Sequence, residues 1–427
     1  MKEIKLQNLK GTTDFLPEQQ ILRNKIIDIL KKNFENYGYL PIETPILNQF
    51  DLLAYKYEED AEILSEVYRL SDQANRDLGL RYDLTIPFCK VIGINKDLSM
   101  PFRRYEIGRV FRNGPVKKGR SREFYQCDVD VVGIKGRYIE VEQMLMVKKI
   151  FSELGIDINI KWNNRKLMSG LLIELDIEKE KINKVISLID RIEKATKDEL
   201  YKEFDNINID RNKVDELFKL FDYTLDEYKD MYKDTSNEIL KQGLEECTEL
   251  QNYIDELKLN DTAMFYPRLA RGLGIYTGTV YEFFDKKLRI TSSLGGGGRY
   301  DKIITEFINN GEEYPACGLS FGLEPIYTIL KEEIKNSSNI DVLIIPMDTE
   351  VKCLELATEL RNNNINTLVE LNKRKLKKSF AYADKHNIKY VIVVGSDEIN
   401  SGVYTLKNMQ TGEQLSLSLD SIIDTIK

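Results

Sequence analysis

Two neighbouring stretches decide the fold: FRRYEIGRVFRNG at residues 102–114 and REFYQCDVDVVG at residues 122–133. Both are rich in aromatic residues and alternate between polar and apolar positions, which is typical of β-strands. A short basic segment, GPVKKGRS, joins them. We therefore expect two antiparallel strands connected by a cationic loop.

Helical patterns surround this strand pair. Residues 17–38 and 137–154 repeat apolar positions at helical spacing, and residues 156–162 indicate a further strand. Residues 165–255 are rich in Lys, Glu, Asp and Leu at helical spacing. Because β-rich patterns lie on both sides of this region, we interpret it as a helical insertion.

Strand patterns resume in TVYEFF, LRITSSL and ACGLSFG, interrupted by the glycine run 295–298 and followed by a helix near 322–335. The polar segment KNSSN at 335–339 predicts a linker, and alternating strands and helices after it predict a small α/β domain. We expect an α+β fold with an antiparallel sheet flanked by helices. Its predicted domains are a catalytic body in two parts (1–164 and 256–334), the insertion (165–255) and the α/β domain (340–427).

Composition limits the class of protein. Hydrophobic residues make up 42% of the chain, charged residues make up 31%, and no apolar run approaches the roughly 20 residues of a membrane span. The start of the chain does not resemble a signal peptide, so we expect a cytoplasmic protein outside the membrane. The five scattered cysteines lack zinc-site spacing, and we expect no protein-bound metal. The one histidine, His386, is expected at the surface.

Arginines are concentrated in and around the strand pair. Guanidinium groups on a rigid sheet suit a phosphate-bearing ligand, because their planar donors bind phosphate oxygens bidentately. A solvated face of an edge strand is the alternative. No G-x-x-x-x-G-K-S/T or G-x-G-x-x-G motif follows a predicted strand, so a nucleotide needs another kind of site. The arginines are Arg103, Arg104, Arg109, Arg112, Arg120 and Arg122.

Acidic residues stand among apolar and aromatic neighbours in two stretches. In LGLRYDLTIPF at 78–88, we expect Asp83 and Thr85 on one face of a short strand. Aspartate is disfavoured in strands, so a polar pocket for an ammonium and a second cationic group explains these residues better than exposed strand faces. The period-two rule places Gln126, Asp128 and Asp130 of FYQCDVD on one face in the same way.

Glycines, arginines and tyrosines recur in RLARGLGIYTGTVYE at 268–282 and SLGGGGRYD at 293–301. Glycines let the backbone approach a ligand closely, and a series of tight turns is the alternative interpretation. Turns alone do not explain the adjacent Arg271 and Arg299, which provide positive charge, or Tyr276 and Tyr300, which provide flat walls.

In their order along the chain, these stretches resemble the histidyl-tRNA synthetase family of class II aminoacyl-tRNA synthetases. YGYLPIETPIL at 37–47 is similar to motif 1, the strand pair to motif 2 and ACGLSFGLEPI at 316–326 to motif 3. The two glycine-rich stretches are similar to the segments that distinguish the histidine enzymes. The C-terminal α/β region is similar to the family's anticodon-binding domain.

The resemblance implies a ligase that joins L-histidine to ATP, with Mg²⁺ on the pyrophosphate, and then transfers histidine to the 3′ end of tRNA(His). It also implies a homodimer built on motif 1. Arg112 and Arg271 would be catalytic and would bind ATP, and Lys117, Lys118 and Arg120 would contact tRNA. The implied histidine site contains Asp83, Thr85 and Gln126 for the ammonium, Asp130 and Tyr276 for the imidazole, and Tyr300 to close the pocket, with Asp130 at its rim.

Three positions depart from the family pattern. Pro325 stands where motif 3 usually ends in an arginine that binds the γ-phosphate. Asn113 and Gly114 stand where motif 2 usually carries an acid that contacts adenine. Gly274 and Ile275 replace an acid and a tyrosine of the signature segment.

Other functions remain open at this stage. A histidine-sensing regulatory subunit of ATP phosphoribosyltransferase would tolerate loss of the ATP arginine, but such subunits generally lack the C-terminal domain. An RNA-binding protein without activity would leave the acidic pocket unexplained. A class I synthetase is excluded because the chain has no HIGH-type motif.

Overall fold

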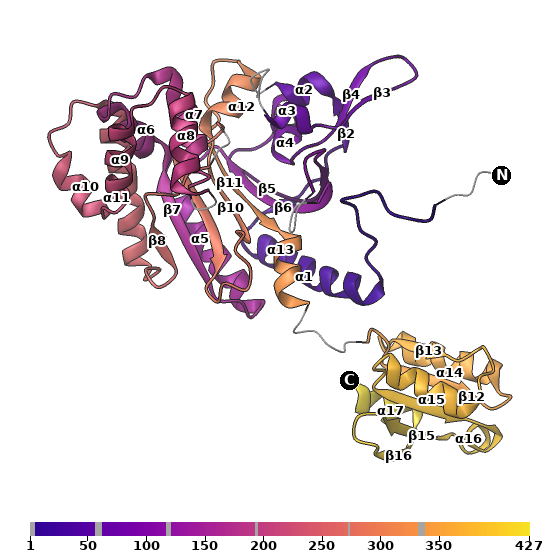
Figure 1. The fold of residues 1–427 in the computed structure, drawn as a ribbon. Helices are drawn as coiled ribbons and strands as arrows, with labels where there is room; N and C mark the ends of the chain where they lie inside the picture. The colour runs from indigo at the N-terminus through magenta and orange to yellow at the C-terminus, as the bar shows by residue number, and fades with distance from the viewer. Residues whose placement is uncertain (1–4, 56–61, 117–120, 193–194, 272–273, 332–337) are drawn as a thin grey trace. The chain divides into compact units, whose positions relative to one another are not determined.

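The computed structural model describes residues 5–55, 62–116, 121–192, 195–271, 274–331 and 338–427. The chain forms two compact units, one of residues 1–14 and 23–329 and the other of residues 15–22 and 330–427. Figure 1 shows the elements of both units. In the described part of the chain, no helix is long and apolar enough to cross a membrane.

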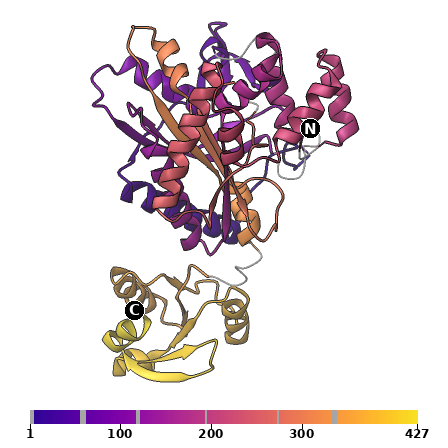
Figure 2. The same cartoon turned by 90° about the vertical axis from the view of Figure 1, so that its left-hand side faces the viewer.

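A large sheet runs through the centre of the first unit (Figures 1 and 2). The expected pair of antiparallel strands is confirmed, because β5 pairs with β6 from Phe102↔Val132 to Phe111↔Glu123. Parallel pairing occurs only in the two edge pairs of this sheet, as far as its described residues extend. The eight described strands are, in order, β1 (Leu40–Pro41), β5 (Phe102–Phe111), β6 (Glu123–Val132), β11 (Ala316–Gly322), β10 (Gly295–Arg299), β9 (Thr279–Asp285), β7 (Ile158–Asn164) and β8 (Ala263–Phe265).

One face of this sheet is apolar and packs against helices α1 (Pro17–Asn36) and α5 (Tyr138–Glu153). Phe34 of α1 lies 5.5 Å from Phe321 of β11, measured between ring centroids. Phe151 of α5 lies 5.5 Å from Phe283 of β9 and 5.9 Å from Phe321. Because side chains alternate along a strand, the residues between these aromatic positions point to the opposite face.

Two expectations for the region before β11 are wrong. LRITSSL at 288–294 does not form a strand, because Asp285 ends β9 by accepting bonds from the backbone and side chain of Arg289. The glycine run does not interrupt the sheet but forms β10, hydrogen-bonded to β9 and β11. Glycine is needed at these positions because neighbouring backbone and side chains leave no room for a Cβ.

A small sheet and several short helices adjoin the β5 side of the large sheet. A backbone bond connects the two sheets, since the Phe111 N–H of β5 donates to the carbonyl oxygen of Arg81, which follows a strand of the small sheet. The small sheet has the order β2 (Leu47–Gln49), β4 (Asp77–Leu80), β3 (Arg69–Ser71). The helices are α2 (Phe50–Ala54), α3 (Glu62–Glu66), α4 (Thr85–Ile94) and α12 (Asp301–Ile308). Helix α13 (Leu323–Leu330) lies instead beside α1 (Figure 1), where Glu324 accepts a bond from Arg23.

The region expected to be helical lies at the β7 side of the sheet (Figure 1). Capping boxes at Thr196 and Thr224 start two of its helices. Helices α6 and α11 pack closely through two glycines: a Cβ at Gly243 would lie 2.3 Å from the Leu167 nitrogen, and one at Gly170 would lie 2.5 Å from the Leu240 Cα. The helices are α6 (Arg165–Glu174), α7 (Lys179–Ile189), α8 (Lys197–Asn206), α9 (Arg211–Leu220), α10 (Leu225–Met231) and α11 (Glu238–Glu256).

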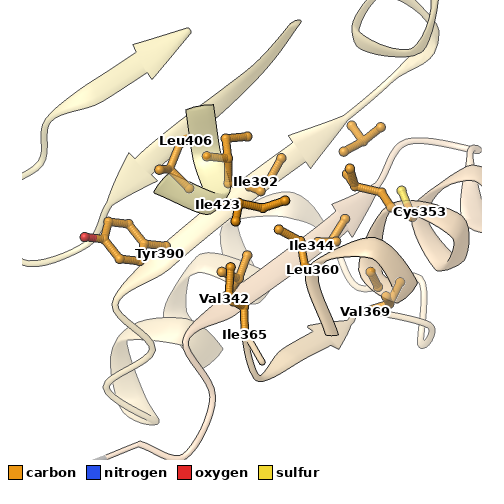
Figure 3. Packing of buried hydrophobic residues seen from close by; sticks show 14 residues of the cluster. Val342, Ile344, Cys353, Leu360, Ile365, Val369, Tyr390, Ile392, Leu406 and Ile423 are labelled. Carbon is orange, nitrogen blue, oxygen red and sulfur yellow. The ribbon is translucent and has the colours of Figure 1, made fainter. Parts of the chain in front are cut away.

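The second unit contains a five-stranded sheet within its described residues. Val342 and Ile344 of β12 point toward α14 and α17, and Figure 3 shows part of this core. Leu343 and Ile345 point to the other face, where α15 covers them. The strand order is β13 (Thr367–Val369), β12 (Val342–Pro346), β14 (Tyr390–Val394), β15 (Val403–Asn408), β16 (Gln414–Ser418). The helices are α14 (Glu350–Asn362), α15 (Leu376–Lys385), α16 (Ser396–Ser401) and α17 (Leu419–Ile426).

Candidate active site

The second face of the large sheet is polar, and its residues align in rows across the strands. The shared face expected for Gln126, Asp128 and Asp130 is confirmed by the pairing of β6 with β5 and β11. Glycines in these rows leave open space above the sheet. One row is Arg104, Asp130, Gly318 and Gly298, and the next is Glu106, Asp128, Ser320, Gly296 and Glu282.

Two of these glycines make room for charged side chains. A Cβ at Gly318 would lie 1.9 Å from Oδ1 of Asp130, and one at Gly296 would lie 2.5 Å from Nη1 of Arg271. Arg271 crosses β10 in this space and donates to Glu282 at 2.8 Å. The glycine run thus allows a cation from another segment to lie over the sheet.

Gly296→Ala should lower the free energy of unfolding by about 1–3 kcal/mol, because the added methyl group collides with Arg271 and with the Tyr281 carbonyl oxygen at 2.6 Å. Urea unfolding measures this change. The matched control is Gly274→Ala, where no atom of the described residues other than its chain neighbours lies within 4 Å of the new Cβ. If both variants unfold at the wild-type midpoint, the space at Gly296 has been misjudged.

Asp130 lies in a buried cluster and not at the rim expected from the sequence. It is 4% exposed, its Oδ2 lies 2.7 Å from Nη2 of Arg104, and its Oδ1 accepts a hydrogen bond from the Tyr300 hydroxyl. Burial raises the pKa of Asp130, while Arg104 and Tyr300 oppose that rise. Removing this carboxylate would leave the fully buried Arg104 without its closest acid.

Asp128 was placed on this face but was given no role in the sequence analysis. It is 4% exposed, and burial raises its pKa to about 7, with Arg104 lowering the pKa and Asp130 raising it further. Oδ1 of Asp128 and Oε1 of Gln126 are both buried, and neither has a hydrogen-bond donor among the described residues. The acids here outnumber nearby guanidinium groups, which favours a cationic ligand. An aspartate inside a central strand was the available sequence signal.

Asp83 and Thr85 do not lie on a strand, which corrects the expected geometry. Asp83 lies in the turn before α4 and accepts from the Ile86 backbone N–H at 3.0 Å, and Thr85 begins the helix. This local bond to a helix N-terminus competes with strand pairing for a short polar side chain. Asp83 still lies near Asp128 and Asp130, since its charge raises the pKa of both.

Arg112 and Arg271, from opposite ends of the site, line one cavity of about 310 Å³ together with Gln126. The Arg112 guanidinium lies 4.1 Å from the centroid of the Tyr82 ring and 5.0 Å from that of Phe124, so aromatic rings hold it in place. Pro325, at the position of the missing motif 3 arginine, also lines the cavity. The cavity can accommodate a phosphate-bearing ligand between two fixed cations.

The two tyrosines expected in the site are both buried near the acids. Tyr276 is 8% exposed and lies below Arg271, with 5.4 Å between the guanidinium carbon and the ring centroid. Tyr300 is 2% exposed and contacts Asp130. The predicted tRNA contacts Lys117, Lys118 and Arg120 lie outside the described residues.

Two family sequence models together match most of the chain. The sequence model of the histidyl-tRNA synthetase family matches residues 11–326, and that of an anticodon-binding domain matches residues 341–427. The chain belongs to the histidyl-tRNA synthetase family. The expected fold class and the expected aminoacyl-tRNA ligase are thereby confirmed.

Histidyl-tRNA synthetase relatives cover the chain almost completely. A histidine–tRNA ligase 1 of Bacillus cereus (strain ATCC 10987) is 44% identical over 99% of this chain and 97% of its own length. A histidine–tRNA ligase of Clostridium tetani is 36% identical over 99% and 98%. The crystal structure of the Nostoc sp. PCC 7120 histidyl-tRNA synthetase has a TM-score of 0.86, with 28% identity over 99% of each chain.

The regulatory alternative is not favoured by these comparisons. A Bacillus halodurans structure described as an ATP phosphoribosyltransferase regulatory subunit/histidyl-tRNA synthetase shares the fold, with a TM-score of 0.75 and 20% identity over 92% of this chain. The relatives with the higher identities are histidine–tRNA ligases, and they extend through the C-terminal unit.

Proposed function

We propose that the chain activates L-histidine with ATP to form histidyl-adenylate and then transfers histidine to the 3′ end of tRNA(His). One observation carries this proposal: Arg112 and Arg271 line a single cavity with Gln126. Gln126 shares one face of β6 with the buried Asp128 and Asp130, and these two acids together are called the acidic row. Two cations suit a triphosphate, and the acids suit an amino acid with a basic side chain.

In this proposal, the acidic row binds the amino acid. The ammonium group lies against Asp83, Thr85 and Gln126, and the nearby Asp128 adds negative charge. Asp130 and Tyr276 bind the two nitrogens of the imidazole, since an acid accepts a bond and a phenol can donate or accept one. Tyr300 closes the pocket and holds the Asp130 carboxylate in place.

Activation requires no protein nucleophile. A carboxylate oxygen of histidine bonds to the α-phosphorus of ATP, and the bond from that phosphorus to the pyrophosphate oxygen breaks. Arg112 and Arg271 stabilise the charge on the phosphate oxygens and hold the reactants in line. A ribose hydroxyl oxygen of the tRNA terminus then bonds to the histidyl carbonyl carbon, and the bond from that carbon to the phosphate oxygen breaks. AMP leaves, and the hydroxyl proton is released to solvent.

Mg²⁺ fits this site as a partner of the nucleotide. Glu324 is an acid that lines the cavity, and it accepts a bond from Arg23 at 3.0 Å. Mg²⁺ commonly uses one or two carboxylates together with substrate phosphates and water. When bound, the ion neutralises charge on the pyrophosphate.

We also propose the predicted domain roles and a homodimer. Residues 1–164 and 256–334 serve catalysis, residues 165–255 form an insertion, and residues 340–427 bind the anticodon.

The dimer is supported by exposed apolar side chains in and beside motif 1, where Leu40 is 63% exposed. Light scattering tests this, and a monomer at working concentration would contradict it. The five cysteines are buried and form no disulfide within the described residues, which agrees with a reducing compartment such as the cytosol.

The second unit carries a basic surface that supports tRNA binding despite the net charge of −8. Lysines at 375, 377, 378, 385 and 389, on α15 and its flanks, are exposed, and within the described residues none forms an ion pair. Phosphate contacts by such lysines raise RNA affinity in a salt-dependent way.

Changing Lys375, Lys377 and Lys378 together to glutamine should raise the KM for tRNA about tenfold and weaken its dependence on salt. Aminoacylation assays at several salt concentrations measure both effects, and ATP–pyrophosphate exchange should not change. The control changes Lys352, Arg361 and Lys427, which belong to the α14 and α17 side of the sheet. Equal effects of both triple variants would contradict a specific α15 surface.

The activity is tested by ATP–pyrophosphate exchange with purified protein, Mg²⁺ and each of the twenty amino acids. We expect exchange with histidine alone, which would also show that Pro325 is tolerated. Exchange with another amino acid would contradict the proposed pocket. Absence of exchange together with calorimetric binding of histidine would favour the regulatory alternative.

A further inference from the structure

The carboxylate of Glu66 lies in the space that a side chain at Gly114 would need. Glu66 is the last residue of α3, it is 8% exposed, and its Oε1 would lie 2.3 Å from a Cβ at Gly114. The Asn113 backbone N–H donates to the Glu66 carbonyl oxygen at 2.7 Å. The end of α3 is therefore attached to the loop that follows β5.

This carboxylate faces the nucleotide cavity, since Glu66, Arg112, Gly114 and Phe124 all line it. Oε2 of Glu66 accepts a bond from the Tyr82 hydroxyl at 3.1 Å. Among the described residues, Oε1 accepts no hydrogen bond, and the carboxylate forms no ion pair. One oxygen thus fixes the carboxylate, and the other can accept a bond from a ligand.

The surroundings of Glu66 suit a flat, aromatic ligand with an amine at its edge. The Phe124 ring lines the cavity and provides a planar surface on which a base can stack. An ionised carboxylate is an acceptor only. It therefore favours the exocyclic amino group of adenine and disfavours the carbonyl oxygen that guanine and hypoxanthine carry at the same position.

We propose that Glu66 selects adenine by accepting a hydrogen bond from its exocyclic amino group, so that an acid from α3 occupies the place left by Gly114 in the motif 2 loop. This inference rests on the proposed ATP site and adds the residue that reads the base. An acid from a different segment accounts for the absence of an acidic residue at 113 and 114.

The test compares ATP with inosine triphosphate, which has a carbonyl oxygen in place of the amino group, in histidine-dependent pyrophosphate exchange. Wild type should favour ATP by about 100-fold or more in kcat/KM. In Glu66→Gln, the amide can donate to the carbonyl oxygen, so the preference should fall at least tenfold. The KM for histidine should stay at its wild-type value. A retained ATP preference in the variant would refute the proposal.

Two further variants separate base selection from structural support. Tyr82→Phe removes the hydroxyl that donates to Glu66 but leaves the carboxylate, so the ATP preference should persist; an equal loss would make Glu66 only a structural partner of Tyr82. Glu123→Gln alters an acid that pairs with Arg109 outside the cavity, and its exchange activity should be that of wild type.

Nucleotide binding tests the proposal even if exchange is lost. Calorimetry with ATP and inosine triphosphate, without histidine, should show the same preference in wild type and its decrease in Glu66→Gln. If wild type binds ATP selectively but exchanges no pyrophosphate, the proposed function fails and the role of Glu66 remains supported. If wild type exchanges with histidine and the variant selects ATP as well as wild type does, only the role of Glu66 fails.

Discussion

Replacing Arg271 with alanine should lower kcat for histidine-dependent pyrophosphate exchange by about 10²–10³-fold. This side chain extends over Gly296 into the cavity, and Glu282 fixes it from below at 2.8 Å. A cation held in this way is placed before charge develops on the phosphate oxygens. Its loss should therefore affect kcat more than the KM for histidine.

Two controls isolate the contribution of the guanidinium group. Arg268→Ala removes an exposed arginine three residues away that pairs with Asp222, and exchange should be unaffected. Arg271→Lys keeps the charge but loses the planar pair of donors, so we expect recovery of only a small part of the activity. Wild-type kcat in Arg271→Ala would mean that this arginine does not contact the reacting phosphate.

The fold was predictable where side-chain periodicity is strong. The pair β5 and β6 follows from strict alternation, and the helices of the insertion follow from apolar residues at helical spacing with threonine caps. Strand β10 was not predictable from pattern, because four consecutive glycines carry no side-chain alternation. Its pairing depends on β9 and β11, which lie on both sides of it and are separate in sequence.

The site was predictable in its residue types but less so in its geometry. Period two correctly placed Gln126, Asp128 and Asp130 on one face. Nothing in the local sequence of Asp130 indicates burial, because the buried Arg104 that pairs with it comes from the neighbouring strand. Glu66 could not be found from sequence at all, since its position depends on how α3 meets the motif 2 loop.

The two halves of the candidate site differ in whether their charged groups have partners in the protein. Arg271 has an acidic partner, Glu282, whereas Oδ1 of Asp128 has no donor among the described residues. A buried carboxylate oxygen without a donor costs stability, and a cationic substrate can supply the missing bond. The amino acid pocket should therefore be strained when empty, in contrast to the phosphate side.

Asp128→Asn should weaken histidine binding and at the same time stabilise the empty protein. Losing a charge-assisted bond to the ammonium should raise the Kd for histidine about 30- to 100-fold. Calorimetry at pH 8 measures this, because most free histidine then carries a neutral imidazole. An unchanged Kd would remove Asp128 from the binding site.

The raised pKa of Asp128 determines whether Asp128→Asn raises or lowers the free energy of unfolding. Burial raises this pKa from 3.8 to about 7, so between those pH values the folded protein binds more protons than the unfolded chain. Stability from this group is therefore lost as the pH rises from 4 to 7, and the loss persists above pH 7. Asparagine does not titrate, so at pH 8 the variant should exceed wild type by about 2–4 kcal/mol in free energy of unfolding.

Urea unfolding at pH 5 and pH 8 tests this sign, with Asp261→Asn as a control. Lys148 lowers the pKa of Asp261, so its substitution should lower stability slightly at pH 8, the reverse of the effect at Asp128. Asp128→Asn could instead be less stable than wild type at pH 8. The attraction between Arg104 and the ionised Asp128 would then stabilise the fold more than burial of the Asp128 charge destabilises it. The acidic row would then be a structural ion cluster and not a site kept ready for a cation.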